Sequence, residues 1–398
     1  MPAEPSTATH AEPNPLWGGD WQAVRDLWPL EPTVAHLNHG SFGAVPTPVL
    51  EEQQSWRDRM ESNPVRFFVR EMPTALAAAR GEIAAFLGAA EGSLAFVPNA
   101  TTGASTVLAV FPLERDDAVL VTDHSYGAVR IAAHRFAADR GARVDTVHVP
   151  LTASDGEAVD AVLGAIHERT RLVVLDHVTS PTARRLPLAE LVPAVQERGA
   201  AVLVDGAHSP GMLGVDLEAL GADFFVGNLH KWCCAARGSA LLHAAARWRG
   251  SLRPLVASWG EAEGFPLAFD DTGTDDPTPW LSAPLAVRVL ERLGWERLRR
   301  HNVELAVTGQ RAVAAAIGVP AGDLPSDPAV PMQLVPLPEG LVTSREQAAA
   351  LQDRIGEESA VEVAITFFDG RGYVRVCAQA YNAPADYQRL AAELPALL

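Results

Sequence analysis

The stretch from Ala201 to Trp232 constrains the chain most, because it places two complementary reactive groups at the ends of two apolar strands. The run AVLVD ends in Asp205, and the run FFVGNLH ends just before Lys231. A lysine just past a buried strand end can lose its proton, since burial disfavours the charged form, and its neutral amine can form a Schiff base with an aldehyde. An aspartate at the neighbouring strand end can keep a pyridinium nitrogen protonated. Together the two groups predict a site for pyridoxal phosphate (PLP).

Short apolar strands alternate with helical segments over the first two thirds of the chain. The expected strands are 94–97, 118–122, 143–149, 172–176, 201–205, the run before Lys231, and 238–243. Such alternation predicts right-handed crossover units and an α/β fold with a mostly parallel sheet, whose site lies beyond the carboxyl ends of the strands. The candidate residues found at such ends are Thr101, His124, Ser180, Asp205 and Lys231.

The last third of the chain has a different pattern. A loop rich in Gly, Asp and Pro at 270–280 is followed by helical segments and short strand-like pieces, which predicts a smaller α+β domain. We therefore expect an N-terminal arm at 1–30, a large PLP-binding domain at 31–270 and a small C-terminal domain at 271–398.

Composition excludes several classes of protein. A formal net charge of -17 argues against nucleic-acid binding, which needs clustered basic residues. No apolar run approaches the roughly 20 residues that cross a bilayer, and the first residues lack the basic and apolar regions of a secretory signal. Three cysteines, two of them adjacent, predict neither a disulfide framework nor a metal site. We expect a cytoplasmic protein with no membrane partner and no metal.

Short motifs extend the argument over almost the whole chain. They are LNHGSFG (37–43), NPVRFFVRE (63–71), NATTGA (99–104), DHSYGA (123–128), HVTSPT (177–182), VDGAH (204–208), GNLHKW (227–232), TPWLSAP (278–284) and RVCAQAYN (375–382). In this order they resemble fold-type I PLP enzymes of the class V aminotransferase and cysteine desulfurase superfamily, and within it isopenicillin N epimerase-like proteins. The resemblance implies a large domain with a mostly parallel seven-stranded sheet, a smaller α+β domain and an amino-acid substrate.

The resemblance also implies a set of cofactor contacts. Thr101 and Thr102 would hold the phosphate at a helix start, where free backbone N–H groups favour anions; the alternative is an ordinary helix cap. His124 or Tyr126 would stack on the ring and could act as an acid or base on its second face, although a lone aromatic at a strand end is more often packing. Contacts to the cofactor are also implied for Ser180 and His208 at its phenolic oxygen, and for Asn228 and His230 near its phosphate.

Two further contacts follow from the resemblance. Gly273 and Thr274 would reach the phosphate of the other subunit's cofactor, which implies a homodimer with its active site at the interface; the alternative is a solvated acidic turn. Arg375 would clamp the substrate's α-carboxylate with its planar fork, with Asn38 also at the substrate, and the alternative is a surface arginine.

Several positions depart from the family pattern. Asn228 stands where a phosphate-binding serine is common, and Ala236, Arg237 and Gly238 replace Pro-Thr-Gly after the lysine. Ala183 replaces a glycine after the SPT motif and is followed by Arg184 and Arg185. The three arginines could recognise an anionic or bulky substrate, but surface charges are the simpler interpretation.

The predicted chemistry begins with removal of the α-proton by Lys231 as general base, with Asp205 supporting the ring as an electron sink. Return of a proton on the other face gives an epimerase, which we expect in secondary metabolism. The alternatives are a C–S lyase, an oxidative deaminase coupled to decarboxylation and an aminotransferase. The resemblance implies that a desulfurase would carry a nucleophilic cysteine shortly before the carboxylate arginine; residues 361–376 contain none and Cys377 follows Arg375, which disfavours persulfide chemistry. A non-catalytic relative is disfavoured because Lys231 and Asp205 are both present, and a Rossmann enzyme because GxGxxG is absent.

Overall fold

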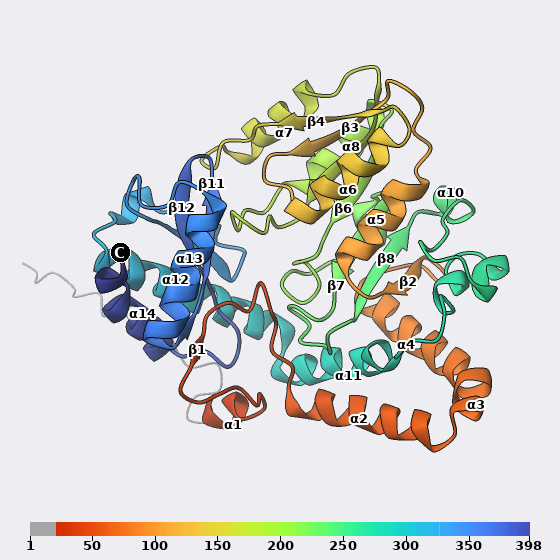
Figure 1. The fold of residues 1–398 in the computed structure, drawn as a ribbon, viewed down its shortest axis with the longest axis horizontal. Coiled ribbons are helices and arrows are strands. Elements are labelled where there is room, and N and C mark those ends of the chain that lie inside the picture. The colour runs from red at the N-terminus through yellow and green to blue at the C-terminus, as the bar shows by residue number, and fades with distance from the viewer. Residues whose placement is uncertain (1–20, 326) are drawn as a thin grey trace, which may run out of the picture.

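A twisted seven-stranded sheet forms the centre of the computed structural model, which describes residues 21–325 and 327–398 (Figure 1). Its strand order is β2-β8-β7-β6-β5-β3-β4, and β8 runs in the direction opposite to the other six strands. The strands are β2 (Leu94–Val97), β3 (Ala118–Thr122), β4 (Arg143–Val147), β5 (Thr170–Asp176), β6 (Ala201–Asp205), β7 (Phe224–Asn228) and β8 (Ala240–Ala244). The predicted α/β fold with a mostly parallel seven-stranded sheet is confirmed.

Helices cover both faces of this sheet, so that its strands are buried on both sides. The helices are α2 (Thr47–Ser62), α3 (Pro64–Arg66), α4 (Met72–Phe86), α5 (Ala100–Val110), α6 (Gly127–Ala138), α7 (Asp155–Gly164), α8 (Leu188–Glu197), α9 (Leu217–Leu220), α10 (Ala246–Arg249) and α11 (Thr278–Leu293), with a π-helical turn η2 (Phe67–Glu71) and 3₁₀ turns η3 (Trp259–Glu263) and η4 (Leu267–Phe269). Two apolar cores result, one on each face. Leu175 and Val204 belong to one core, and Val174 and Leu203 to the other.

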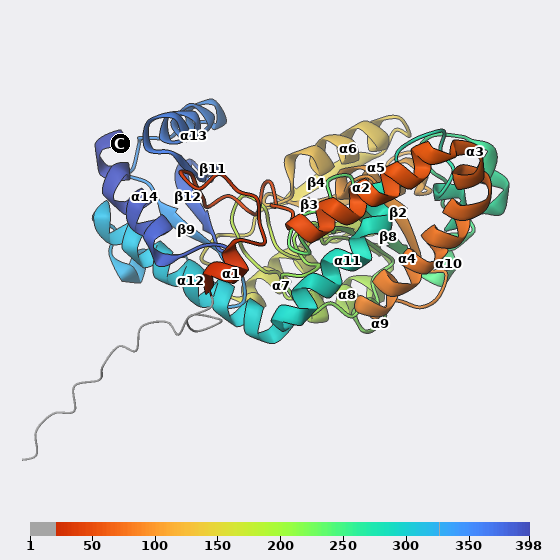
Figure 2. The same ribbon diagram turned by 90° about the horizontal axis from the view of Figure 1, so that it is seen from below.

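A second, smaller body packs at the carboxyl ends of the parallel strands (Figure 2). Its three-stranded antiparallel sheet has the order β11-β12-β9. Its elements are α12 (Trp295–Ala316), η5 (Ala321–Asp323), β9 (Met332–Pro336), α13 (Arg345–Ser359), β10 (Val361–Glu362), β11 (Ala364–Phe368), β12 (Arg371–Cys377) and α14 (Pro384–Leu397). The expected α+β character of the C-terminal part agrees with these elements.

The start of the described chain lies against this smaller body. Short α1 (Trp21–Arg25) is followed by β1 (Ala35–His36), which pairs in parallel with β10. The indole of Trp21 donates to the carbonyl of Ala380, 3.0 Å away. Of the predicted arm at 1–30, residues 1–20 lie outside the described residues.

The packing of α11 suggests a later domain boundary than position 271. Leu281, Ala286 and Val289 of α11 belong to the core of the large domain, whereas Leu305 and Val313 of α12 belong to the core of the small one. The two helices meet at Gly294, whose φ of +84° suits glycine. We infer that the boundary falls there. Across the described residues, no helix has the length and apolar character that crossing a membrane requires.

Candidate active site

A cavity of about 330 Å³ opens beyond the carboxyl ends of the parallel strands. Topology explains its position, because neighbouring parallel strands all end at the same edge of the sheet. Of the residues predicted from the sequence, the cavity is lined by Thr101, Tyr126, Ser180, Asp205, His208, Asn228, His230 and Lys231. Residues from at least five loops, distant in sequence, therefore meet at one place.

Lys231 lies just after β7 and is partly buried where it lines the cavity. Burial, helped by the positive charge of Arg375, lowers the pKa of its amine to about 8, although Asp205 and Cys377 act in the opposite direction. Its Nζ lies 3.2 Å from Nε2 of His208. A lysine in this environment is partly neutral near physiological pH and can act as a nucleophile or as a base.

Two carboxyl groups lie side by side at the strand ends. Asp176 ends β5 and is the register partner of Asp205, which ends β6, and both line the cavity. Burial raises the pKa of each carboxyl group. For Asp176 the neighbouring Asp205 adds to the effect, and its pKa lies well above the ordinary value. The Oδ2 atom of Asp176 is buried without a hydrogen-bond partner among the described residues.

Asp176 was not among the predicted site residues, because an aspartate after a strand is equally typical of a turn. Its register with Asp205 was the available signal, since β5 and β6 end level with each other. The Asp176 Oδ1 atom accepts the backbone N–H of Tyr126 at 3.3 Å. Asp176, with its raised pKa, therefore links the Tyr126 loop to the Asp205 strand end.

The start of α5 forms another part of the cavity wall. Asn99 caps the helix by accepting the backbone N–H of Thr102 at 2.8 Å, and Asn228 accepts the backbone N–H of Ala100 at 2.8 Å. Thr101 lines the cavity, whereas the Thr102 hydroxyl is turned back onto Asn99 at 3.1 Å. Thr101 is thus in place for the predicted phosphate contact. Asn228 organises the same helix start, and Thr102 takes part in the cap.

His124 does not reach the cavity, which corrects the expectation that it could stack on the cofactor. Its ring is fully buried, with Nδ1 2.6 Å from the Thr182 hydroxyl and Nε2 donating to the Val149 carbonyl at 2.6 Å. The ring packs on Phe368, with the two centroids 4.2 Å apart. Tyr126, 44% exposed, lines the cavity instead. Of these two residues Tyr126 lines the cavity and His124 does not, so the second-face role stays a prediction for Tyr126.

Arg375 of β12 stands directly behind the cavity wall and is buried. Its guanidinium donates to the hydroxyl of Ser41 at 2.8 Å, to Asn38 Oδ1 at 3.2 Å and to the hydroxyl of Ser180 at 3.3 Å. Ser41 and Ser180 line the cavity. The Nε–H of Arg375 has no partner among the described residues, which leaves a buried donor for an anionic group.

A chain of polar contacts fixes the backbone of the lysine loop. His39 lies 3.1 Å from the Lys231 carbonyl through Nε2 and 2.8 Å from the Tyr381 hydroxyl through Nδ1. Burial lowers the pKa of His39 to about 3, so the ring is neutral, donating to the carbonyl and accepting from the phenol. Neither residue was predicted as functional, although they lie in the motifs LNHGSFG and RVCAQAYN.

His230 lines the cavity, but its neutral ring is not a hydrogen-bond donor to a phosphate there. Its Nδ1–H donates to the Ser239 carbonyl at 2.8 Å, and burial lowers its pKa to about 4. The neutral ring therefore presents an Nε2 lone pair, which is an acceptor. To hold a phosphate, His230 has to gain a proton.

Gly273 and Thr274 are not brought to the lysine cavity. They line a separate cavity of about 180 Å³, together with Phe68, Met72 and Trp280. Within one subunit, Lys231 and the loop of Gly273 and Thr274 line different cavities, and the contact of this loop with the cofactor of another subunit stays a prediction.

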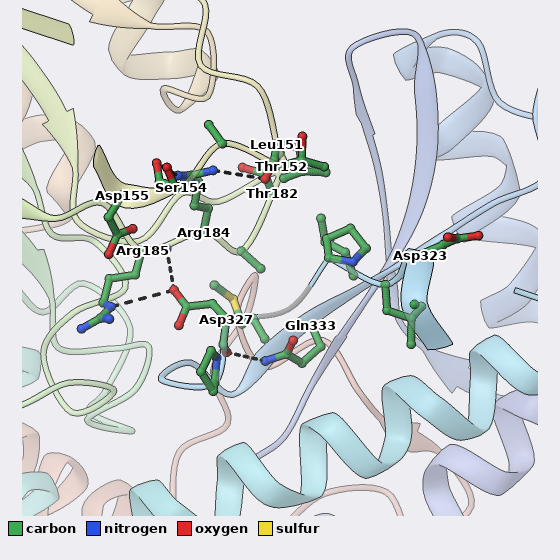
Figure 3. A pocket seen from close by; sticks show the side chains of 18 residues that line it. Leu151, Thr152, Ser154, Asp155, Thr182, Arg184, Arg185, Asp323, Asp327 and Gln333 are labelled. Atoms are coloured by element: carbon green, nitrogen blue, oxygen red, sulfur yellow. Dashed lines mark hydrogen bonds and ion pairs between the residues drawn. The ribbon is translucent and has the colours of Figure 1, made fainter. Parts of the chain in front are cut away.

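A larger cavity of about 690 Å³ lies between the two bodies, apart from the lysine cavity (Figure 3). There the Arg184 guanidinium donates to the carbonyls of Pro150 and Leu151 at 3.2 and 3.1 Å, and Arg185 lies 3.8 Å from Asp327. These arginines hold loops together. Arg184 is buried, so it is not the surface charge that was the simpler interpretation.

Arg237 has a comparable structural contact near the lysine loop. Its guanidinium donates to the Gly43 carbonyl at 3.3 Å.

Comparisons with known proteins agree with this geometry. Isopenicillin N epimerase of Streptomyces clavuligerus is 32% identical over 95% of this chain and 98% of its own length. Putative L-cysteine desulfhydrase 1 of Oryza sativa subsp. japonica is 31% identical over 90% of this chain and 82% of its own. A solved structure of C-DES with glycine covalently linked to its PLP cofactor superposes with a TM-score of 0.80, at 21% identity, over 93% of this chain and 98% of that chain. The model of the aminotransferase class-V family matches residues 43–390, and the chain belongs to that family.

Proposed function

We propose that this chain is a PLP-dependent enzyme that removes the α-proton of an amino acid or amino-acid conjugate and returns a proton to the opposite face. The observation that carries the proposal is the partly buried Lys231 amine with its lowered pKa, which shares one cavity with Asp205 and Tyr126. The epimerase relatives, which match over almost their whole length, support the same reaction class.

The residues around the cavity fit the cofactor. An aldehyde needs an amine, a pyridine nitrogen needs a carboxylate, and a phosphate needs a helix start; Lys231, Asp205 and Thr101 supply these three groups in one space. Ser180 and His208 are positioned for the phenolic oxygen. When bound, PLP supplies an electron sink for the electron pair left at the α-carbon.

The protein's own groups then divide the work between two faces. Arg375 would hold the α-carboxylate, a role supported by its buried Nε–H without a partner among the described residues and by its bond to Asn38. Lys231 takes the α-proton onto its neutral amine. The Tyr126 hydroxyl donates a proton to the α-carbon from the other side, and solvent restores both groups to their starting forms. The number of protons is conserved, and the configuration at the α-carbon is inverted.

Proton NMR in deuterated water tests this proposal. The panel contains free amino acids, S-linked cysteine conjugates and a peptide like isopenicillin N. We expect deuterium at the α-carbon with the skeleton intact and a mixture of configurations. Lys231→Ala should abolish exchange, whereas Tyr126→Phe should keep exchange but lose inversion. Exchange that survives in Lys231→Ala would overturn the assignment of the base.

The second candidate is β-elimination, favoured by the L-cysteine desulfhydrase relatives at 30 to 31% identity. It begins with the same proton transfer to Lys231, but a thiolate then leaves the β-carbon. The NMR panel separates the two reactions, because pyruvate and a free thiol appear only with elimination. An aldehyde product would instead indicate the oxidative route.

We further propose a homodimer with the active site at the interface. Large apolar side chains stay exposed near the cavity and on the 250–270 segment: Phe42, Tyr126, Leu255, Val256, Trp259 and Leu267. Trp259 is 93% exposed in one subunit, which favours burial against another copy. A partner would also bring its Gly273 and Thr274 loop toward the cofactor. The three free cysteines are buried thiols, which supports the cytoplasm as the compartment.

A further inference from the structure

His208 lies between two nitrogen-bearing side chains whose chemistry determines its tautomer. The indole Nε1 of Trp232 lies 3.2 Å from Nδ1 of His208, and Nζ of Lys231 lies 3.2 Å from Nε2 of the same ring. His208 and Trp232 are buried, and burial lowers the pKa of His208 well below its ordinary value, so its ring is neutral. An indole N–H can only donate. Nδ1 of His208 therefore carries the lone pair, and the single ring proton is on Nε2.

The same geometry determines which form of Lys231 fits. Nε2–H of His208 points at the amine and can only donate, so Nζ has to accept. A neutral amine has a lone pair for this bond, whereas an ammonium would set two donors against each other. The charged groups that face Lys231 are Arg375, which disfavours the ammonium, and Asp205, which favours it, as the Cys377 thiol does when ionised.

We propose that Trp232 is a positioning residue: its indole N–H holds His208 in the Nε2–H tautomer, and His208 in turn stabilises the neutral amine of Lys231. The inference deepens the proposed function and rests on it for its purpose, because a neutral amine is the form that attacks an aldehyde or accepts a proton. The hydrogen-bond chain itself belongs to the protein without cofactor.

The fold holds this chain of contacts rigidly. Trp232 is 1% exposed and packs against the ring of His39, with the two centroids 4.8 Å apart. The loop after β6 crosses the Trp232 backbone so closely that a Cβ on Gly211 would lie 2.4 Å from its carbonyl oxygen. His208 and Trp232 therefore have little room to adopt another arrangement.

The composition of the chain makes the test direct. Lysine and arginine total 32 residues, 31 of which are arginine, so Lys231 is the only lysine. Protein labelled with ¹⁵N at lysine Nζ gives one side-chain signal, and its titration in the full chain stripped of cofactor reports the pKa of Lys231 alone.

Trp232→Phe keeps a buried ring but removes the N–H. His208 can then take the Nδ1–H tautomer and accept from the ammonium, so we expect the pKa of Lys231 to rise by about one unit, a tenfold change in its ionisation equilibrium. The matched control is Trp248→Phe, which removes an indole N–H that donates to Asp223 far from the cavity. It should leave the lysine titration unchanged.

A measurement on the unmodified protein covers the case in which Trp232→Phe does not fold. Histidine ¹⁵N shifts distinguish the two tautomers, and His208→Gln identifies which signal belongs to His208. The proposal expects the Nε2–H form. An Nδ1–H signal, or a folded Trp232→Phe protein that titrates like the wild type, would overturn it. Neither experiment uses substrate. A negative result would therefore overturn the role of Trp232 without bearing on the proposed reaction.

Discussion

At the scale of single residues, burial sets which groups around the cavity carry charge. The Lys231 amine has a lowered pKa because it is enclosed, and the Asp176 carboxyl has a raised pKa for the same reason together with the adjacent Asp205. Burial thus brings the pKa of the Lys231 amine close to physiological pH, where a general base works best.

The raised pKa of Asp176 makes stability depend on pH. Its folded pKa lies above the unfolded value of 3.8, so the folded protein holds a proton that the unfolded chain releases. This stabilisation is complete below the unfolded pKa and is lost as pH rises through the folded pKa. Asp176→Asn mimics the neutral acid. As pH rises, the free energy of unfolding of this variant should therefore fall less steeply than that of the wild type, with a difference of up to about 1.4 kcal/mol per pH unit.

Urea unfolding of the cofactor-free protein at a series of pH values measures this difference. Asp145→Asn is a useful control, because its pKa is lowered through His167 and Arg143 despite partial burial, and its effect should have the opposite sign. Parallel stability curves for wild type and Asp176→Asn would show that Asp176 is ionised in the folded protein.

Arg375→Lys should separate substrate binding from cofactor binding. Lysine keeps the positive charge but lacks the planar fork and the Nε–H that has no protein partner. We expect KM for the amino acid to rise about tenfold to a hundredfold, the loss of one or two charge-assisted hydrogen bonds. PLP affinity, followed by absorbance, should change little, and an equal loss of both would argue against a carboxylate clamp.

At the scale of elements, the site depends on two backbone segments pressed together. The segment after β1 crosses the lysine loop, and a Cβ on Gly43 would lie 2.7 Å from the His230 carbonyl oxygen and 2.8 Å from that of Lys231. The Lys231 carbonyl is also held by His39. Contact between two backbones leaves no flexible side chain to move aside, so the position of the lysine depends on the absence of a side chain at 43.

Gly43→Ala should therefore destabilise the protein by about 1–3 kcal/mol and weaken PLP binding. The matched control is Gly81→Ala in α4, where a Cβ meets nothing within 4 Å. There the helix propensity of alanine should raise stability by about 0.5–1 kcal/mol. Thermal unfolding of both variants measures the contrast, and equal effects would exclude the steric explanation.

Sequence patterns predicted the elements well where local signals are strong. The strands at 94–97, 118–122 and 201–205 agree with β2, β3 and β6 residue for residue, because each is a short apolar run bounded by turn residues. The pattern did not show that α11 packs on the large domain. An apolar helix face predicts burial but does not specify the surface against which the helix packs. Likewise, the fully buried position of His124 depends on contacts with Thr182 and Phe368, which are distant in sequence.

At the scale of the whole molecule, one subunit holds the lysine and a distant loop of the same subunit holds Gly273 and Thr274. If that loop serves the partner's site, two different inactive variants can repair each other. Lys231→Ala and Thr274→Asp should each be inactive alone. Mixed one to one through reversible unfolding, they should recover about a quarter of wild-type activity, because half of the dimers contain one intact site of two.

Sedimentation of the mixture checks that dimers have formed. A mixture that forms dimers but stays inactive would place the loop of 273 and 274 at its own subunit's site or at no site. Trp259→Glu offers an independent control, since a charge on this exposed tryptophan should favour the monomer of 42.4 kDa.

The presence of one lysine, buried at the centre of the site, has a consequence for proteolysis. An endoprotease that cuts only after lysine has a single target bond in this chain, between Lys231 and Trp232. That bond has to open before it is cut, so its rate of cleavage reports how often the segment around Lys231 opens, either locally or when the whole fold opens. Every cut yields the same two fragments, one of 231 and one of 167 residues, and a gel can follow the motion.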